Sequence, residues 1–123
     1  MNRANYLSVP EAFNLRNVID IVNRSFGMCY LVGSCLTKRD YRDVDIRCIM
    51  DDEDFNRRFP GVAEEPMYDA EWSLICAAVS EWLAKRTGLP IDFQIQRMSY
   101  ANKLFGQPEH QRQAIFTIER SSP

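Results

Sequence analysis

The stretch YLVGSCLTKRDYRDVDIRCIM, from Tyr30 to Met50, decides how this chain is interpreted. A short apolar run ends in Gly33 and Ser34, and eight residues later a second segment carries the pair Asp43 and Asp45. Aspartate is depleted in ordinary strands, so two of them on one short strand require a specific explanation.

The spacing of the two aspartates suits metal binding. On a strand with a two-residue period, Asp43 and Asp45 share one face and lie roughly 6.5 Å apart at their Cα atoms, while Val44 and Ile46 share the other face. Both side chains can then reach metal ions about 3.5–4 Å apart. Two carboxylates about 5 Å apart at an effective dielectric of about 20 repel each other by about 3 kcal/mol, which a divalent cation would relieve.

A third carboxylate lies on a later predicted strand. The segment LPIDFQIQ (89–96) alternates apolar and polar residues, which is typical of a half-buried strand. Its polar face carries Asp92, Gln94 and Gln96. Arg47 follows the aspartate pair on the earlier strand, so all of these side chains would meet on one face if the two strands are adjacent.

The Gly-Ser turn suits a phosphate group. A glycine after a strand lets the backbone approach a ligand without a Cβ clash. Exposed N–H groups and the Ser34 hydroxyl can hold phosphate oxygens. Lys38, Arg39 or Arg42 in the following turn would add positive charge near a triphosphate. Together with the carboxylates, the turn predicts a metal–phosphate site.

The remaining pattern predicts an α+β fold in two layers, a small mixed sheet with helices packed on one face. The 123 residues suffice for one domain. Helices are expected at 8–27, 54–59, 69–88 and 99–105, strands at 28–33, 43–50 and 90–96, and a last strand or extended arm at 113–119. Ser8 and Glu11 form a capping box, and Gly27 is expected to end the first helix. Asp69 can cap the helix at 69–88, and Gly88 and Pro90 are expected to stop it.

Composition excludes several function classes. A net charge of −2 and a pI near 5.4 argue against a protein that mainly grips nucleic-acid backbones. The four cysteines form no C-x-x-C pair and His110 is the only histidine, so zinc is not expected, and the thiols should be buried and reduced. The chain shows neither a signal peptide nor an apolar run of about 20 residues, so we expect a cytoplasmic protein without membrane contact.

The segment LVGSCLTKRDYRDVDIRCI resembles the signature of the DNA polymerase beta-like nucleotidyltransferase superfamily, and LPIDFQIQ is similar to the strand that carries its third carboxylate. The resemblance covers about Val9 to Gln96 and is closest to the minimal, single-domain members. It implies a single domain over 1–123, with a polymerase beta-like core at about 9–96 and a tail at 97–123.

The resemblance also implies a role for each residue of these motifs. Gly33 and Ser34 would position the phosphates of a nucleoside triphosphate such as ATP. Asp43 and Asp45 would bridge two Mg²⁺ ions, or Mn²⁺ in their place, and Asp92 would ligate the catalytic ion and help deprotonate a hydroxyl. That hydroxyl would attack the α-phosphorus, taking the NMP and releasing pyrophosphate.

The chain departs from the family pattern in two ways. The spacer of eight residues after Ser34 is short, so the phosphate loop must be tight. Only 27 residues follow Gln96, so the acceptor site must come from the tail, a second copy of the chain, or a helical protein partner. The acceptor itself would be a small molecule, a protein hydroxyl or an RNA end.

Two alternatives stay open from the sequence. The first is a catalytically idle, antitoxin-like module that keeps the fold and binds a nucleotide or a partner without transferring anything. The second is that Asp43, Asp45 and Asp92 are solvent-facing strand residues, whose substitution would change stability by only a few tenths of a kcal/mol.

Overall fold

The computed structural model describes residues 5–63, 68–105 and 112–115, so His110 and most of the segment 113–119 lie outside the described residues. In chain order the elements are α1 (Val9–Ser25), β1 (Met28–Val32), the 3-10 helix η1 (Gly33–Leu36), β2 (Val44–Met50), α2 (Asp52–Arg58), α3 (Ala70–Thr87), β3 (Ile91–Arg97), α4 (Met98–Phe105) and β4 (Gln113–Ala114). The predicted α+β fold with a mixed sheet is confirmed.

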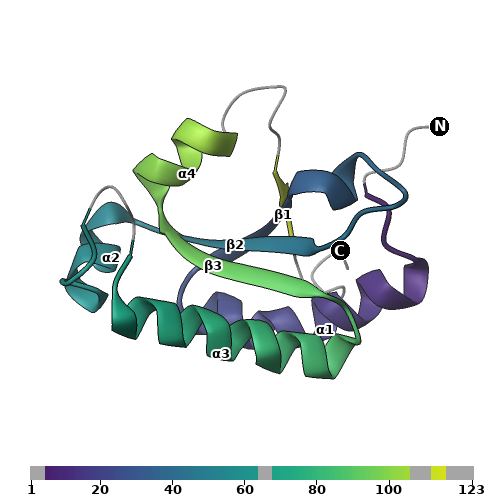
Figure 1. Ribbon diagram of the computed structural model, residues 1–123, viewed down its shortest axis with the longest axis horizontal. Helices are drawn as coiled ribbons and strands as arrows, with labels where there is room; N and C mark the ends of the chain where they lie inside the picture. The colour runs from purple at the N-terminus through teal and green to yellow at the C-terminus, as the bar shows by residue number, and fades with distance from the viewer. Residues whose placement is uncertain (1–4, 64–67, 106–111, 116–123) are drawn as a thin grey trace, which may run out of the picture.

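The sheet has the strand order β3-β2-β1-β4 (Figure 1). β1 pairs antiparallel with both β2 and β4, whereas β2 and β3 are parallel. The connection between the parallel strands runs through α2 and α3, since parallel neighbours need a long crossover. β2 and β3, which carry Asp45 and Asp92, are therefore direct neighbours, with β2 in the middle of the sheet and β3 at one edge.

One face of the sheet packs on α1 and α3, which lie side by side beneath it (Figure 1). The alternation along β2 sends Val44, Ile46 and Cys48 into this core, where each is fully buried. All four cysteines are buried free thiols, as predicted. No helix in the described part of the chain combines the length and hydrophobicity that a membrane crossing requires.

The helix ends follow local chemistry. At α1 the Ser8 hydroxyl accepts a hydrogen bond from the Glu11 N–H at 3.2 Å, and the Glu11 carboxylate accepts one from the Ser8 N–H at 2.9 Å. α3 begins at Asp69, whose side chain accepts a hydrogen bond from the Trp72 N–H, and ends at Gly88 in the left-handed region with φ +75°. Both N-terminal caps and the α3 C-cap agree with the sequence prediction.

Several element boundaries differ from the prediction by one or two residues, and two of the differences have a clear physical cause. α1 ends with Phe26 as its C-cap rather than Gly27. A Cβ at Gly27 would come within 2.5 Å of the Ile49 carbonyl oxygen, so this glycine permits close approach to β2. α2 begins at Asp52 instead of 54, because three acidic residues in its first turn favour the helix N-terminus.

The expectation that all helices pack on one face is wrong for α4. This helix lies over the face opposite α1 and α3, which we call the open face (Figure 1). It contacts β2 and β3 near their final residues, and Ala101 on it is fully buried. Ile49 and Gln96 point away from the core but are only 5% and 2% exposed. The open face is therefore covered at this end and stays partly exposed at the other.

Candidate functional site

Asp45 and Asp92 lie side by side on the open face. The parallel register of β2 and β3 makes them Cα partners. Both are partly buried, and the Asp92 side chain is 47% exposed. Burial and the nearby charges of Asp92 and Asp43 raise the pKa of the Asp45 carboxyl above its ordinary value, while the charge of Arg47 opposes this shift. The repulsion expected from the sequence is thus present between strands.

Arg47 is the cation that compensates this carboxylate pair. Its Nη2 lies 3.6 Å from Asp92 Oδ2, and its Nη1 donates hydrogen bonds to the backbone oxygens of Asp92 at 2.8 Å and Ile46 at 3.0 Å. The side chain is only 12% exposed. Two buried polar atoms on this face, Arg47 Nε and Gln96 Oε1, have no hydrogen-bond partner within the described residues. The sequence placed Arg47 on this face but gave no partner for it.

Gly33 is required by its contact with Asp45. It has φ +78°, a conformation that favours glycine. A Cβ built on it would overlap Asp45 Oδ2, because Val32 is the cross-strand partner of Asp45 and the chain turns directly over that carboxylate. The Gly-Ser turn and the aspartate strand are therefore in contact, as a metal–phosphate site requires.

The loop after Gly33 is tight, as its short spacer predicts. Ser34 follows Gly33 in η1, and its carbonyl oxygen accepts hydrogen bonds from the N–H groups of Thr37 at 3.0 Å and Lys38 at 2.7 Å. Beneath the turn, burial and the charge of Asp45 raise the pKa of the Cys35 thiol to about 11, so this thiol stays protonated and unreactive at neutral pH.

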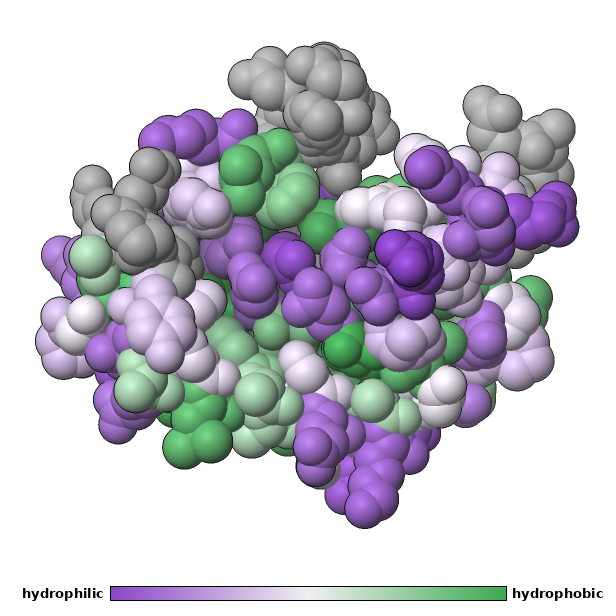
Figure 2. All heavy atoms as spheres, in the orientation of Figure 1, coloured by the Kyte–Doolittle hydropathy of each residue, from purple (hydrophilic) through white to green (hydrophobic). Residues whose placement is uncertain are grey.

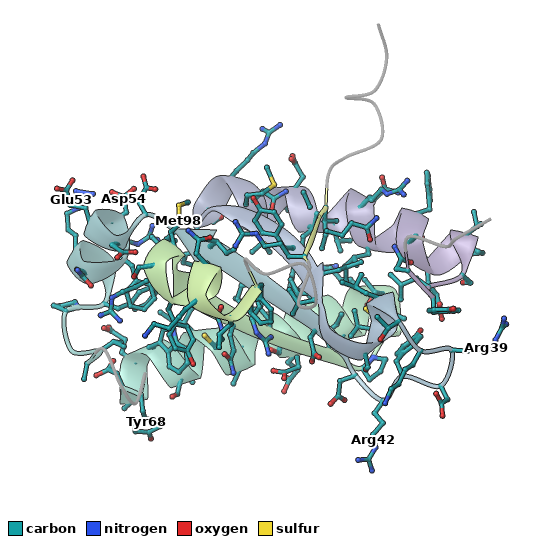
Figure 3. All side chains as sticks on the ribbon, turned by 90° about the horizontal axis from the view of Figure 1, so that it is seen from above. Arg39, Arg42, Glu53, Asp54, Tyr68 and Met98 are labelled. Atoms are coloured by element: carbon teal, nitrogen blue, oxygen red, sulfur yellow. The ribbon has the colours of Figure 1, made fainter. Side chains whose placement is uncertain are left out.

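A pocket of about 440 Å³ joins the turn to the aspartates. Its lining residues are Ser34, Lys38, Asp40, Tyr41, Arg42, Asp43 and Asp45. Most of the predicted phosphate-binding and metal-binding residues thus face one cavity, whereas Gly33 and Asp92 do not line it. Asp40 and Tyr41 were not predicted, because their place in an irregular loop gives no periodic signal. Figure 3 shows Arg39 and Arg42 projecting from this loop, at the end of the sheet away from α4.

Three predicted residues lie less centrally. Asp43 precedes β2 and is exposed, so it does not share a strand face with Asp45 as predicted. Asp92 does not line the pocket and lies beside it on β3. Arg39 is turned toward the ring of Tyr6, with Cζ 5.8 Å from the ring centroid.

The predicted metal ligands form a pair, Asp45 and Asp92, with Asp43 close by. Within residues 5–63, 68–105 and 112–115, no three His, Cys, Asp or Glu side chains are arranged as a metal-binding group. Asp45 and Asp92 nevertheless fit a divalent cation in charge and donor chemistry, because hard cations prefer carboxylate oxygens and would relieve the repulsion that raises the Asp45 pKa. Asp43 is near enough for its charge to act on Asp45.

Comparison with known protein families, curated proteins and solved structures finds no match to this chain. A function for it therefore has to follow from the side chains of this site.

Proposed function

We propose that the chain is a Mg²⁺-dependent nucleotidyltransferase that moves an NMP from a nucleoside triphosphate to a hydroxyl and releases pyrophosphate. The strongest support is that two kinds of group line one pocket. Ser34, Lys38 and Arg42 lie there together with the carboxylates of Asp43 and Asp45. Cationic and hydroxyl groups suit phosphate oxygens, whereas carboxylates repel a bare phosphate. A triphosphate that carries a divalent cation satisfies both sets of groups.

The phosphates would occupy the loop side of the pocket. The Ser34 hydroxyl can donate to a phosphate oxygen, and the exposed side chains of Lys38 and Arg42 can pair with the outer phosphates. The volume of about 440 Å³ is within the range of about 300–1,000 Å³ that small-molecule sites occupy. Gly33 lets the turn lie directly against Asp45, because a Cβ there would overlap Asp45 Oδ2.

The carboxylates would hold the metal. Asp45 is central, with Asp92 beside it on β3 and Asp43 at the pocket wall. When bound, Mg²⁺ would neutralise the phosphate charge and polarise the α-phosphate. Asp45 would have to lose its proton first, which its raised pKa makes harder at acidic pH.

Asp92 would act on the acceptor. It lies beside Asp45 but outside the pocket lining, and its side chain is 47% exposed, which would let a hydroxyl reach it. In the transfer, the acceptor oxygen bonds to the α-phosphorus, the bond to pyrophosphate breaks, and the hydroxyl proton passes to the Asp92 carboxylate. Arg47 would fix Asp92 through its bonds to both the carboxylate and the backbone oxygen.

Thermal unfolding with each of the four NTPs, with and without Mg²⁺, tests this proposal. At about 100 times the dissociation constant, a ligand should stabilise the protein by about 2.7 kcal/mol. We expect this shift only with Mg²⁺, and we expect Asp45→Asn to abolish it. The matched control is Asp20→Asn, which makes the same change on α1, where Asp20 pairs with Arg24. The absence of a Mg²⁺-dependent shift with every NTP would contradict the proposal.

Turnover separates transfer from binding alone. With the nucleotide that binds, slow release of pyrophosphate, as the NMP is transferred to water or to an added hydroxyl compound, would support a transferase. Mg²⁺-dependent binding without any pyrophosphate release would favour the nucleotide-binding module instead. In either case Asp92→Asn should leave nucleotide binding more intact than Asp45→Asn, because Asp92 lies outside the pocket lining.

A further inference from the structure

Beyond the carboxylate pair, a row of polar side chains crosses the open face from β3 to β4. Arg47 contacts Asp92, and Tyr30 is the Cα partner of Arg47 on the adjacent strand β1. The guanidinium of Arg112, just before β4, lies over the Tyr30 ring with Cζ 4.9 Å from the ring centroid. Its Nη1 donates to Asn102 Oδ1 on α4 at 3.0 Å. The Arg112 guanidinium therefore lies over the Tyr30 ring, whereas the Arg47 guanidinium on the neighbouring strand is directed toward β3 and the candidate site.

The positive charge of this row is only partly compensated. Within the described residues, Arg112 has no carboxylate partner, and its partners are the Tyr30 ring and the neutral Asn102 amide. Arg47 Nη2 lies 3.6 Å from Asp92 Oδ2, and its Nε is buried without a hydrogen-bond partner among the described residues. Arg47 Nε is buried out of reach of a ligand, so the charge that an incoming anion could compensate is mainly that of Arg112.

The row lies on the opposite side of Asp45 from the phosphate loop. Arg47 is two residues beyond Asp45 on β2, roughly 6.5 Å further along the strand. The pocket lining, by contrast, lies at and before Asp45 and includes neither Arg47 nor Tyr30. Figure 2 shows hydrophilic residues in a band above α3, where the β3 edge of the sheet faces the viewer. A ligand group bound at the row would thus be distinct from the triphosphate.

We propose that Arg47, Tyr30 and Arg112 form a second subsite, which binds a phosphate group of the acceptor. The role of this ligand as the acceptor rests on the proposed transferase function, whereas the binding of a phosphate group at the subsite does not. Guanidinium groups form forked hydrogen bonds with phosphate oxygens, and an arginine held flat on an aromatic ring is already ordered for such binding. The acceptor would place its hydroxyl at Asp92 and its phosphate on this row.

Backbone amide NMR shifts during titration test the subsite directly. The probes are ribose 5-phosphate, unphosphorylated ribose, and an RNA trinucleotide with free 5′- and 3′-hydroxyls, each without Mg²⁺ or nucleotide. We expect the phosphate-bearing probes to shift the amides of Tyr30, Arg47 and Gln94, and ribose to shift them much less. Binding of ribose 5-phosphate alone would identify a small phosphorylated acceptor, and binding of the trinucleotide alone an RNA end.

Three variants assign the binding to the row. Arg112→Gln should weaken it about tenfold, the loss of one charged hydrogen bond. Arg112→Lys, which keeps the charge but loses the fork, should give an intermediate value. Arg86→Gln is the matched control, because Arg86 likewise stacks on a ring, that of Trp82 on α3, with Cζ 4.6 Å from the centroid. The melting temperatures of the variants would show that all remain folded.

The proposal is overturned if neither phosphate-bearing probe shifts these amides, if ribose shifts them equally, or if Arg112→Gln binds as tightly as wild type. Failure of the proposed function is a separate result, since it concerns Mg²⁺-dependent NTP binding. That binding should be the same, within about twofold, in Arg112→Gln and wild type. Loss of NTP binding in Arg112→Gln would likewise contradict two separate subsites.

Discussion

Gly33 and Asp45 are in such close contact that a single added carbon on Gly33 would overlap the Asp45 carboxylate. The backbone of the turn therefore forms one wall of the space around that carboxylate. This contact explains why a glycine with φ +78° follows β1 and why the aspartate faces it from β2. It links the Gly-Ser turn to the carboxylates, and the first prediction follows from it.

Gly33→Ala should disrupt the site more than it disrupts the fold. The left-handed backbone costs about 1–2 kcal/mol with alanine, and the added Cβ must also push Asp45 Oδ2 away. Gly88→Ala is the matched control, because Gly88 has φ +75° but no atom within 4 Å of a Cβ. Urea unfolding should show losses of stability of similar size in both variants, whereas Mg²⁺-dependent nucleotide binding should fail only in Gly33→Ala. Equal binding by both variants would disprove the role of this contact.

Asp45→Asn should stabilise the metal-free protein at neutral pH. Burial, with the charges of Asp92 and Asp43, raises the Asp45 pKa, so the folded state holds this proton to higher pH than the unfolded chain. Stability then falls as pH rises from about 3.9, the ordinary value, through the raised pKa, and the penalty persists at pH 7. Each kcal/mol regained should raise Tm by about 4 °C.

The check for Asp45→Asn is a series of melting curves from pH 3 to pH 8 in EDTA. The gain in Tm over wild type should be present at pH 7 and shrink toward zero below about pH 3.5, where the wild-type carboxyl is protonated in both states. An Asn variant that is less stable at pH 7, or a gain that does not depend on pH, would show that Asp45 is not under electrostatic strain.

Arg47→Met should shift Mg²⁺ binding toward higher pH. The charge of Arg47 lowers the Asp45 pKa, so its loss lets Asp45 keep a proton to higher pH, and that proton competes with the ion. Titration calorimetry of Mg²⁺ between pH 5 and pH 8 would measure the shift. Arg24→Met, at an exposed arginine on α1, should leave the profile unchanged. Identical profiles for Arg47→Met and wild type would contradict this electrostatic role.

Arg97→Met should destabilise the fold without affecting the site. The Arg97 side chain, only 6% exposed, lies over Phe55 and donates to Asn56 Oδ1 at 2.7 Å and the Val62 oxygen at 2.8 Å. Methionine fills similar volume but leaves these acceptors unpaired, at a cost of about 2–4 kcal/mol. Denaturant unfolding should report this loss, while nucleotide affinity should stay within about twofold. An unchanged free energy of unfolding in Arg97→Met would mean that water replaces the guanidinium.

Much of the fold could be predicted because its signals are local. The alternation from Val44 to Cys48 identified the buried and open faces of β2, since a strand has a two-residue period that any register preserves. The caps at Ser8 and Asp69 were readable for the same reason, because each needs only the next three residues.

The remaining features depend on contacts between distant segments. The pairing of Asp45 with Asp92 needs a parallel register set by a crossover of 40 residues, so the sequence could suggest adjacency but not the alignment. The position of α4 depends on which part of the open face the rest of the fold leaves uncovered. The partner of Arg47 and the ring beneath Arg112 follow from the same tertiary arrangement and have no local signal.

The most direct test of the central claim is a crystal structure with Mn²⁺ and a non-hydrolysable triphosphate of the nucleotide that gives the largest thermal shift. Anomalous scattering would locate the ion independently of the phosphates. We predict a Mn²⁺ peak bound by Asp45 together with Asp43 or Asp92, and a triphosphate against Ser34, Lys38 and Arg42. A triphosphate bound elsewhere, or an ion away from Asp45, would contradict the proposed site and with it the transferase.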